Sequence, residues 1–250
     1  MPVPESAEAV LLAEVEGANA EEASAGALEL AAQFRAAGAT DVALALDPAT
    51  EAAMWELRHA ASPILSRLDP SLKSMQFIED GCVPPERLAD YVRGVRAALD
   101  RQGIRGVIFG HAGDAHVHVN PLVDLRDADW RIRVDALLAE VTALSARLGG
   151  TLAGEHGDGR LRASLLAQVW PPETLERFAA VKQAFDPDAV LNPGVKIAMP
   201  GARAVDQVKY DPALTPLPSD ARRALARVEH ERAYARFRLE LLDDAGTAEA

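Results

Sequence analysis

Three of the chain's six histidines fall within eight positions, in the stretch GHAGDAHVHVN at residues 110–120. They are His111, His116 and His118. Imidazole is a common metal ligand and the side chain best suited to proton transfer near neutral pH. This concentration therefore indicates a metal-binding or proton-transfer site.

The residues around the histidines predict a β-hairpin, with strands at 105–111 and 115–120. The link between them is too short for a crossover, so the strands pair antiparallel. A Gly-Asp pair is acceptable in a two-residue turn, which places 113–114 at the tip of the hairpin. In that register His111 faces His116.

Alternation of side chains along a strand places His116, His118 and Asn120 on one face of the hairpin. His111 joins that face across the ladder, directly opposite His116 and diagonal to His118. The geometry therefore allows either His111 with His116, or His111 with His118, as a pair of ligands for one ion.

The stretch GEHGDG at residues 154–159 offers a third ligand, because Glu155 and His156 stand side by side there. Its three glycines allow a close approach of backbone to a ligand, or a positive φ. Two histidines and a carboxylate with an open position suit Zn²⁺ chemistry, and equally Fe²⁺ or Mn²⁺.

These motifs need elements to position them. The pattern predicts strands at 9–16, 41–46, 75–83, 105–111 and 115–120, and a strand from 151 that enters the glycine-rich loop. It predicts helices at 20–37, 48–68, 85–102, 127–148, 172–185 and 219–242. We expect an α+β fold in which helices cover one face of a mostly antiparallel sheet.

Composition excludes several classes of protein. The 250 residues carry a formal net charge of −12, which argues against binding to nucleic acid. No stretch is apolar enough for a transmembrane segment, and the N-terminus does not resemble a secretory signal. The single cysteine, Cys82, excludes an internal disulfide, so we expect a cytoplasmic protein.

The motifs GHAGDAHVHVNPL, GEHGDGRLR and FDPDAVLNPGVK, together with FIEDGCVPPERL, resemble the C-terminal domain of FAD-linked oxidases and dehydrogenases. These are flavoproteins of the vanillyl-alcohol-oxidase fold, among them D-lactate dehydrogenase, glycolate oxidase subunits and D-2-hydroxyglutarate dehydrogenase. The resemblance implies a ferredoxin-like substrate (cap) domain over residues 1–200. Residues 201–250 would then form an extended segment and a C-terminal helix.

The resemblance also implies roles for the residues of the two histidine motifs. His111, His118 and Glu155 match the metal ligands, and His156 matches the catalytic base. The family more often has Asn at the position of His116, which leaves open whether His116 is a hydrogen-bond donor behind the ligands or contacts the substrate.

Other positions match the family's substrate-binding and flavin-binding segments. Arg58, in ELRHAAS, matches the arginine that binds the substrate carboxylate. The remaining candidates for substrate contact are Ser62, Lys73, Asn120 and His116, and the candidates for contact with the cofactor are Asn192 and Gly194.

The implied reaction is oxidation of a D-2-hydroxy acid to a 2-oxo acid, with a divalent metal, zinc above all, assisting loss of the hydroxyl proton and FAD accepting the hydride. Electrons would pass onward to a quinone, oxygen or another redox protein.

We find no dinucleotide-binding glycine motif, so the FAD-binding domain is expected to be missing from this chain. A truncated gene, an excised domain and a separate subunit are all compatible with this absence, and the opening methionine suits the first and third. Alone, the chain is expected to bind metal but no stable FAD. The alternatives are a metal- or ligand-binding module without turnover, or a docking subunit. A zinc hydrolase is weakened by the lack of an H-E-x-x-H helix.

Overall fold

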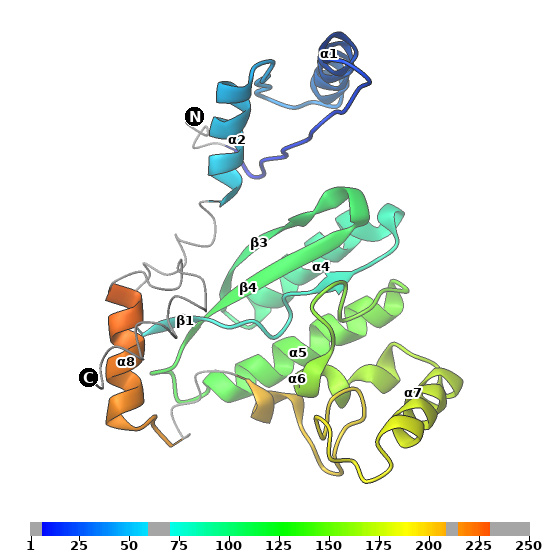
Figure 1. Cartoon of the computed structure of the whole chain (residues 1–250), viewed down its shortest axis with the longest axis vertical. Coiled ribbons are helices and arrows are strands. Elements are labelled where there is room, and N and C mark those ends of the chain that lie inside the picture. The colour runs from blue at the N-terminus through cyan, green and yellow to red at the C-terminus, as the bar shows by residue number, and fades with distance from the viewer. Residues whose placement is uncertain (1–6, 60–70, 209–214, 231–250) are drawn as a thin grey trace, which may run out of the picture.

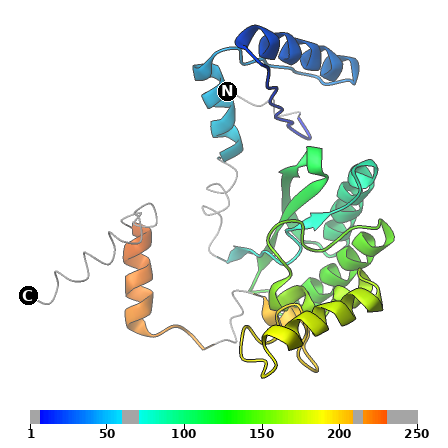
Figure 2. The same cartoon turned by 45° about the vertical axis from the view of Figure 1, so that its right-hand side comes forward.

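The computed structural model describes residues 7–59, 71–208 and 215–230. Its main body is a small antiparallel sheet packed on helices, with two N-terminal helices at one end of the molecule and helix α8 at one side (Figures 1 and 2). The α+β class predicted from the sequence is confirmed. The ferredoxin-like arrangement stays a prediction.

Strand β4 (His116–Asp124) is the centre of the sheet. On one side it pairs with β3 (Arg105–His111). On its other side it pairs first with β2 (Gly81–Cys82) and then with β1 (Leu72–Ser74), and all three pairings are antiparallel. The β3–β4 ladder confirms the predicted hairpin and the pairing of His111 with His116, but the two-residue turn at 113–114 was wrong: residues 112–115 link the strands, beginning with the 3₁₀ turn Ala112–Asp114.

The two faces of the hairpin have different surroundings. Helices α4 (Leu88–Arg101) and α5 (Trp130–Arg147) pack on one face, where Val117 and Val119 of β4 are buried. His116, His118 and Asn120 alternate with these valines and point to the opposite face. The apolar core therefore fixes the strand that presents the polar site.

Short elements follow α5 along the chain. Helix α6 spans Gly159–Ala163 and α7 spans Pro172–Phe185, the same residues that the sequence predicts. The described residues also form 3₁₀ turns, two before α5 at Pro85–Arg87 and Ala112–Asp114 and two after it at Leu166–Gln168 and Ala204–Gln207. Ala204, Val205 and Val208 belong to the main core, past the predicted boundary at residue 200.

The peripheral helices are capped largely as the sequence predicts. Helix α1 (Ala20–Ala36) is followed by Gly38, whose φ of 96° suits a position just past a helix end. Helix α2 (Pro48–His59) is capped by Asp47, whose carboxylate accepts the N–H groups of Ala49 and Thr50. Helix α8 (Ser219–His230) confirms the described part of the predicted C-terminal helix.

Four strand predictions were wrong in whole or in part. The predicted strand from 151 is only an isolated bridge between Thr151 and Cys82. Residues 9–16 and 41–46 are not assigned to strands and pair with no strand among the described residues. Val15 instead lies against Gly26 of α1, while Val10 and Leu11 of the same segment are exposed. In the predicted strand 75–83, only β2 joins the ladder, because residues 75–80 turn away from it and bring Glu79 and Asp80 beneath the glycine-rich loop.

The outer edge of β3 is open in the part of the chain that the structure describes, where β3 pairs with β4 alone. The unpaired N-terminal segments expose large apolar side chains, including Val10, Leu11 and Leu46, each more than half accessible. Within the same described residues, no helix has the length and hydrophobicity needed to span a bilayer.

The core predicts a clear difference between two positions on α5. Leu137 is fully buried, whereas Ile132 is 69% exposed. Replacing Leu137 by Ala should lower the free energy of unfolding by about 2–5 kcal/mol, because it leaves a cavity that the surroundings fill only in part. Ile132→Ala is the matched control and should change it little. Urea denaturation measures both, and equal effects would contradict this account of the core.

Candidate functional site

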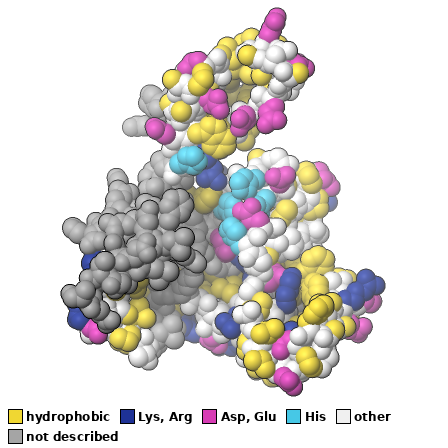
Figure 3. Space-filling model, in the orientation of Figure 1, with side chains coloured by type: hydrophobic (Ala, Val, Ile, Leu, Met, Phe, Trp, Pro, Cys, Tyr) yellow, Lys and Arg dark blue, Asp and Glu magenta, His cyan; other side chains and the backbone are white. Residues whose placement is uncertain are grey.

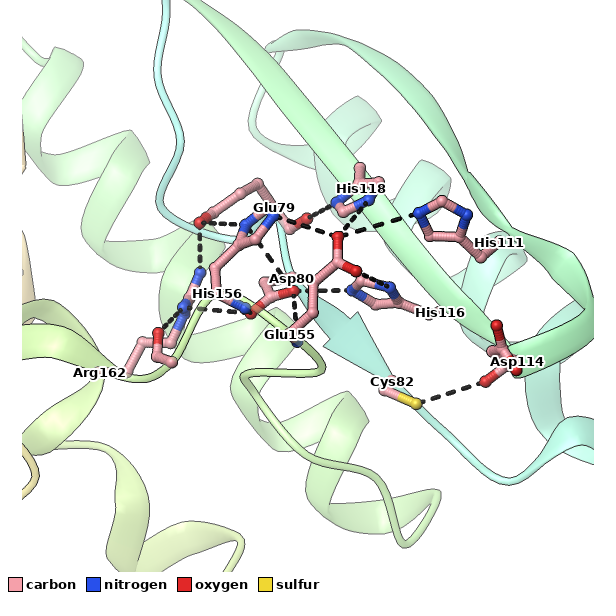
Figure 4. A network of polar contacts seen from close by, with 11 residues as sticks. Glu79, Asp80, Cys82, His111, Asp114, His116, His118, Glu155, His156 and Arg162 are labelled. Carbon is pink, nitrogen blue, oxygen red and sulfur yellow. Dashed lines mark hydrogen bonds and ion pairs between the residues drawn. The ribbon is translucent and has the colours of Figure 1, made fainter. Parts of the chain in front are cut away.

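The three histidines of the hairpin lie close together (Figure 4). His111 pairs with His116 across the ladder, as predicted. The tip is the 3₁₀ turn Ala112–Asp114, closed by Ala115 in the left-handed conformation with φ of 49°. The rings of His111 and His116 are stacked at 5.6 Å, and the His118 ring lies edge-on to both.

Glu155 reaches this group from the glycine-rich loop. One of its carboxylate oxygens lies 3.2 Å from Nε2 of His118 and 3.9 Å from Nε2 of His111, and the other lies 4.0 Å from Nδ1 of His116. One ligand atom from each of these four residues lies within 4.8 Å of the others. The structure therefore brings together all three sequence-predicted ligands, and His116 with them.

His118 has one nitrogen available for a ligand. Its Nδ1 donates a hydrogen bond of 3.0 Å to the carbonyl oxygen of Glu79, which leaves the lone pair of Nε2 facing Glu155. Burial lowers the pKa of His118, and the neighbouring His116 adds to this effect. A neutral imidazole is the form that binds a metal ion.

Asp80 lies beneath the site with no exposed surface. Its carboxylate accepts hydrogen bonds from Nε2 of His116 at 2.7 Å and from the backbone N–H groups of Glu155 at 3.2 Å and His156 at 2.8 Å. Burial raises the pKa of Asp80, but these donors lower it by more, so the net shift is downward. An ionised Asp80 thus holds residues of both motifs.

Arg162 of α6 places a positive charge beside two buried carboxylates, those of Glu79 and Asp80. It is 5% exposed, and its guanidinium lies 2.6 Å from Glu79 and 3.7 Å from Asp80. It also donates to the carbonyl oxygen of Gly157 at 2.7 Å. The second carboxylate oxygen of Glu79 is buried without a hydrogen-bond partner. The loop is therefore held from below by a buried ion-pair network.

His156 lies beside the four converging residues and is about half exposed. Its ring stacks on His118 with centroids 5.2 Å apart, and its Nε2 lies 3.2 Å from Glu155. Its Nδ1 faces Glu79 at 3.7 Å and Asp80 at 3.8 Å. An accessible imidazole is a side chain that can exchange a proton with a molecule entering the site.

The glycines of the loop serve two different purposes. A Cβ at Gly154 would lie 2.6 Å from Cδ2 and 2.8 Å from Nε2 of His116, so only glycine lets the loop pass over this ring. Gly157 and Gly159 have φ of 77° and 57°, as expected for glycine in a tight turn.

The predicted substrate residues are distributed unevenly. The Arg58 guanidinium lies 5.1 Å from the centroid of the Phe109 ring, which in turn contacts His118 at 5.2 Å. Asn120 follows His118 by two residues in β4, so it lies on the same face of the strand, and it is buried. Lys73 pairs with Val123, which places it about 17 Å along β4 from His118. Ser62 falls outside the described residues.

Asn192 and Gly194 form a turn with positive φ values of 45° and 82°. Arg160 donates to the carbonyl oxygen of Pro193 at 2.7 Å, and Lys196 forms an ion pair with the buried Asp158. Both Asp158 and Arg160 follow the loop that carries Glu155. The predicted cofactor-contacting turn is thus attached to the predicted metal-binding loop.

Sequence reasoning missed the network beneath the site, which consists of Glu79, Asp80 and Arg162. The available signal was the acidic pair in a segment predicted to be a buried strand, because buried carboxylates require partners.

Cys82 is also nearby, and its thiol contacts the carbonyl oxygen of Asp114. Burial, followed by the charges of Asp114 and Asp80, raises the pKa of Cys82. This disfavours the reactive thiolate.

Comparison with known proteins identifies the family of this chain. Residues 1–195 match the family described as FAD linked oxidases, C-terminal domain. The chain is 38% identical over 158 residues to D-2-hydroxyglutarate dehydrogenase of Escherichia coli (strain K12), covering 63% of the chain and 15% of that protein. It is 33% identical over 203 residues to glycolate oxidase subunit GlcD of Bacillus subtilis (strain 168), covering 81% and 42%. D-lactate dehydrogenase of Archaeoglobus fulgidus is 36% identical over 122 residues, covering 49% and 27%.

The chain belongs to the family of C-terminal domains of FAD linked oxidases, as the resemblance of its motifs indicated. It spans less than half the length of each of these three relatives.

The contact between Gly154 and His116 gives a test of the site's packing. Gly154→Ala should push the imidazole away from Asp80 and lower the free energy of unfolding, because the new methyl group overlaps the ring. Gly113→Ala is the matched control, since a Cβ there meets nothing within 4 Å. Urea denaturation, with the NMR signal of the His116 Nε2 proton, would report the change. Wild-type stability in Gly154→Ala would contradict the geometry.

Asp186 stabilises the segment that precedes the 192–194 turn, and this gives a prediction of how stability depends on pH. Its hydrogen bond with Lys182, aided by the N–H groups of Leu191 and Val190, holds the pKa of Asp186 below its ordinary value. The Asp186 carboxyl group therefore binds its proton more tightly in the unfolded chain than in the folded one. The stabilisation is complete above the unfolded pKa of about 3.9 and is lost as the pH falls through the folded value.

Accordingly, Asp186→Asn should lower the urea midpoint at neutral pH, and its difference from wild type should shrink below about pH 4. The matched control is Asp188→Asn, two residues further on at an exposed position, which should leave the midpoint near the wild-type value. A midpoint difference for Asp186→Asn that persists unchanged into strong acid would argue against this linkage.

Proposed function

We propose that this chain is the substrate-domain part of a flavin-dependent dehydrogenase or oxidase that converts a D-2-hydroxy acid to the 2-oxo acid. The substrate would be of the D-lactate, glycolate or D-2-hydroxyglutarate type. The observation that carries the proposal is the convergence of His111, His118 and Glu155 beside the accessible His156. The names of the relatives support the same class of substrate.

The donor set fits a divalent metal ion. We propose that Nε2 of His111, Nε2 of His118 and the carboxylate of Glu155 hold it, with zinc as the first choice because imidazole and carboxylate suit it. Fe²⁺ and Mn²⁺ accept the same donors. When bound, the ion would lower the pKa of a coordinated hydroxyl group, and FAD would accept the hydride.

His156 is the proposed base for the hydroxyl proton. Its side chain is accessible, and its ring nitrogens lie within 4 Å of carboxylate oxygens of Glu155, Glu79 and Asp80, beside the proposed metal ligands. Histidines gather with acidic side chains on one face of the molecule, where a small acid has access to them (Figure 3). We propose that Arg58 binds the substrate carboxylate through a two-pronged contact and that Asn120 adds a polar contact.

FAD would be bound mainly by a separate FAD-binding domain or subunit. Exposed apolar side chains surround the 192–194 turn, notably Phe185, Val190 and Leu191, which are 84%, 71% and 61% accessible. A patch of this kind is typical of a surface that a protein partner covers. We propose that Asn192 and Gly194 contact the cofactor from this side, and that a quinone or another redox protein accepts the electrons.

The test uses the chain assembled with its flavin-binding partner. His156→Ala should slow flavin reduction by a D-2-hydroxy acid by about 100- to 10,000-fold, the contribution typical of a general base. Elemental analysis should find the metal content unchanged, because His156 is not a proposed ligand. A panel of D-lactate, glycolate and D-2-hydroxyglutarate would define the substrate.

His59→Ala is the matched control, because His59 lies on α2 and stacks on Trp55 outside the site. It should reduce the flavin at the wild-type rate. Undiminished flavin reduction in His156→Ala would remove the base from the mechanism. Metal binding without reduction by any acid of the panel, in the presence of the partner, would instead favour a ligand-binding module.

A further inference from the structure

We infer that His116 is a fourth metal ligand, binding through Nδ1, and that Asp80 positions it. This inference rests on the proposed metal centre and extends its set of donors. His116 is the residue for which the sequence left two roles open, and the family pattern more often has Asn there. In the structure its side chain is 6% exposed and lies between Asp80 and Glu155.

The two nitrogens of His116 have different environments. Nε2 lies 2.7 Å from a carboxylate oxygen of Asp80. An ionised carboxylate only accepts hydrogen bonds, so Nε2 carries the proton and Nδ1 keeps its lone pair. That lone pair is on the side of Glu155, whose nearer oxygen is 4.0 Å away. A carboxylate behind a histidine is the usual arrangement for fixing the tautomer of a metal ligand.

The distances are suitable for a common ion. In a tetrahedral zinc site with bonds of 2.0–2.1 Å, the ligand atoms lie about 3.3 Å apart. One ring nitrogen or carboxylate oxygen from each of His111, His116, His118 and Glu155 lies within 4.8 Å of the others, and Nδ1 of His116 lies 4.0 Å from the nearer oxygen of Glu155. Small rotations of the side chains would therefore bring the four ligand atoms to one ion, and the substrate hydroxyl would take a fifth position, because a catalytic zinc site can become five-coordinate. The Asp80 and Glu79 contacts already select which nitrogen His116 and His118 present.

A second grouping is possible, formed by Asp80, His118, Glu155 and His156. It would use Asp80 as a ligand, although this carboxylate already accepts three N–H groups and faces Arg162. Binding a metal there would disrupt hydrogen bonds that position His116 and the loop. The geometry therefore favours Asp80 as a positioning residue and His116 as the ligand.

The experiment measures Zn²⁺ affinity of the full chain, freed of metal with EDTA, by competition with a coloured chelator. His116→Asn and His116→Ala should lower the affinity at least about 100-fold, the upper end of what losing an outer hydrogen-bond partner costs. Asp80→Asn should lower it about 10- to 100-fold. The matched control, His59→Ala, should bind as wild type does.

His118→Ala and Glu155→Ala separate this inference from the proposed function. If both lose affinity while the His116 variants bind as wild type, the fourth ligand is refuted and the proposed centre stands. If neither loses affinity, the metal centre itself is refuted, and the inference with it.

A measurement on the wild-type chain avoids variants that fold poorly. In ¹⁵N NMR of labelled histidines, Zn²⁺ should shift Nδ1 of His116 and Nε2 of His118, while Nε2 of His116 stays protonated. In Asp80→Asn the preference of His116 for the Nε2-protonated tautomer should weaken. A Zn²⁺-dependent shift confined to His111 and His118 would overturn the inference.

Discussion

The site depends on one buried carboxylate. Asp80 is separated in sequence by 36 residues from His116 and by 75 and 76 residues from Glu155 and His156, yet it accepts a hydrogen bond from each. An ionised group with no exposure is costly unless it is paired and hydrogen-bonded. Its partners come from β4, the glycine-rich loop and, at longer range, Arg162 of α6. Satisfying this single charge therefore fixes the relative positions of three segments.

The sheet makes this arrangement possible by separating two environments. Val117 and Val119 are buried against helices, and this packing determines which way the alternate residues of β4 point. A shift of one residue in register would bring His116 and His118 into the core, at the cost of burying polar groups without partners. The apolar face of the strand thus specifies the polar one. The hairpin tip then adds His111 from β3.

Much of this could be predicted because it is local. The alternation in HVHVN gives the shared face of the histidines, the short link gives the hairpin, and helix-ending signals such as Gly38 and capping residues such as Asp47 mark element ends. The position of Glu155 next to the histidines depends on a long-range contact. The resemblance of the motifs indicated this contact, whereas the geometry of the hairpin alone could not.

The features that could not be predicted depend on which of several possible neighbours a segment contacts in the folded chain. Segment 9–16 has the pattern of a buried strand, but periodicity does not say what, if anything, covers it. In the structure Val15 lies against Gly26 of α1, whereas Val10 and Leu11 are exposed. Segment 75–83 has the apolar content of a strand, yet Glu79 and Asp80 draw it out of the ladder toward Arg162. Residues such as Arg162 gain their importance only from tertiary contacts that no short motif encodes.

The open edge of β3 has a consequence for how this polypeptide behaves in concentrated solution. An edge strand offers free N–H and C=O groups to any extended segment that approaches it. The same chain carries such segments at 9–16 and 41–46, apolar and without ladder partners among the described residues. Concentration therefore favours contact between this edge and such segments of neighbouring molecules, and charged or bulky groups near the edge would oppose it.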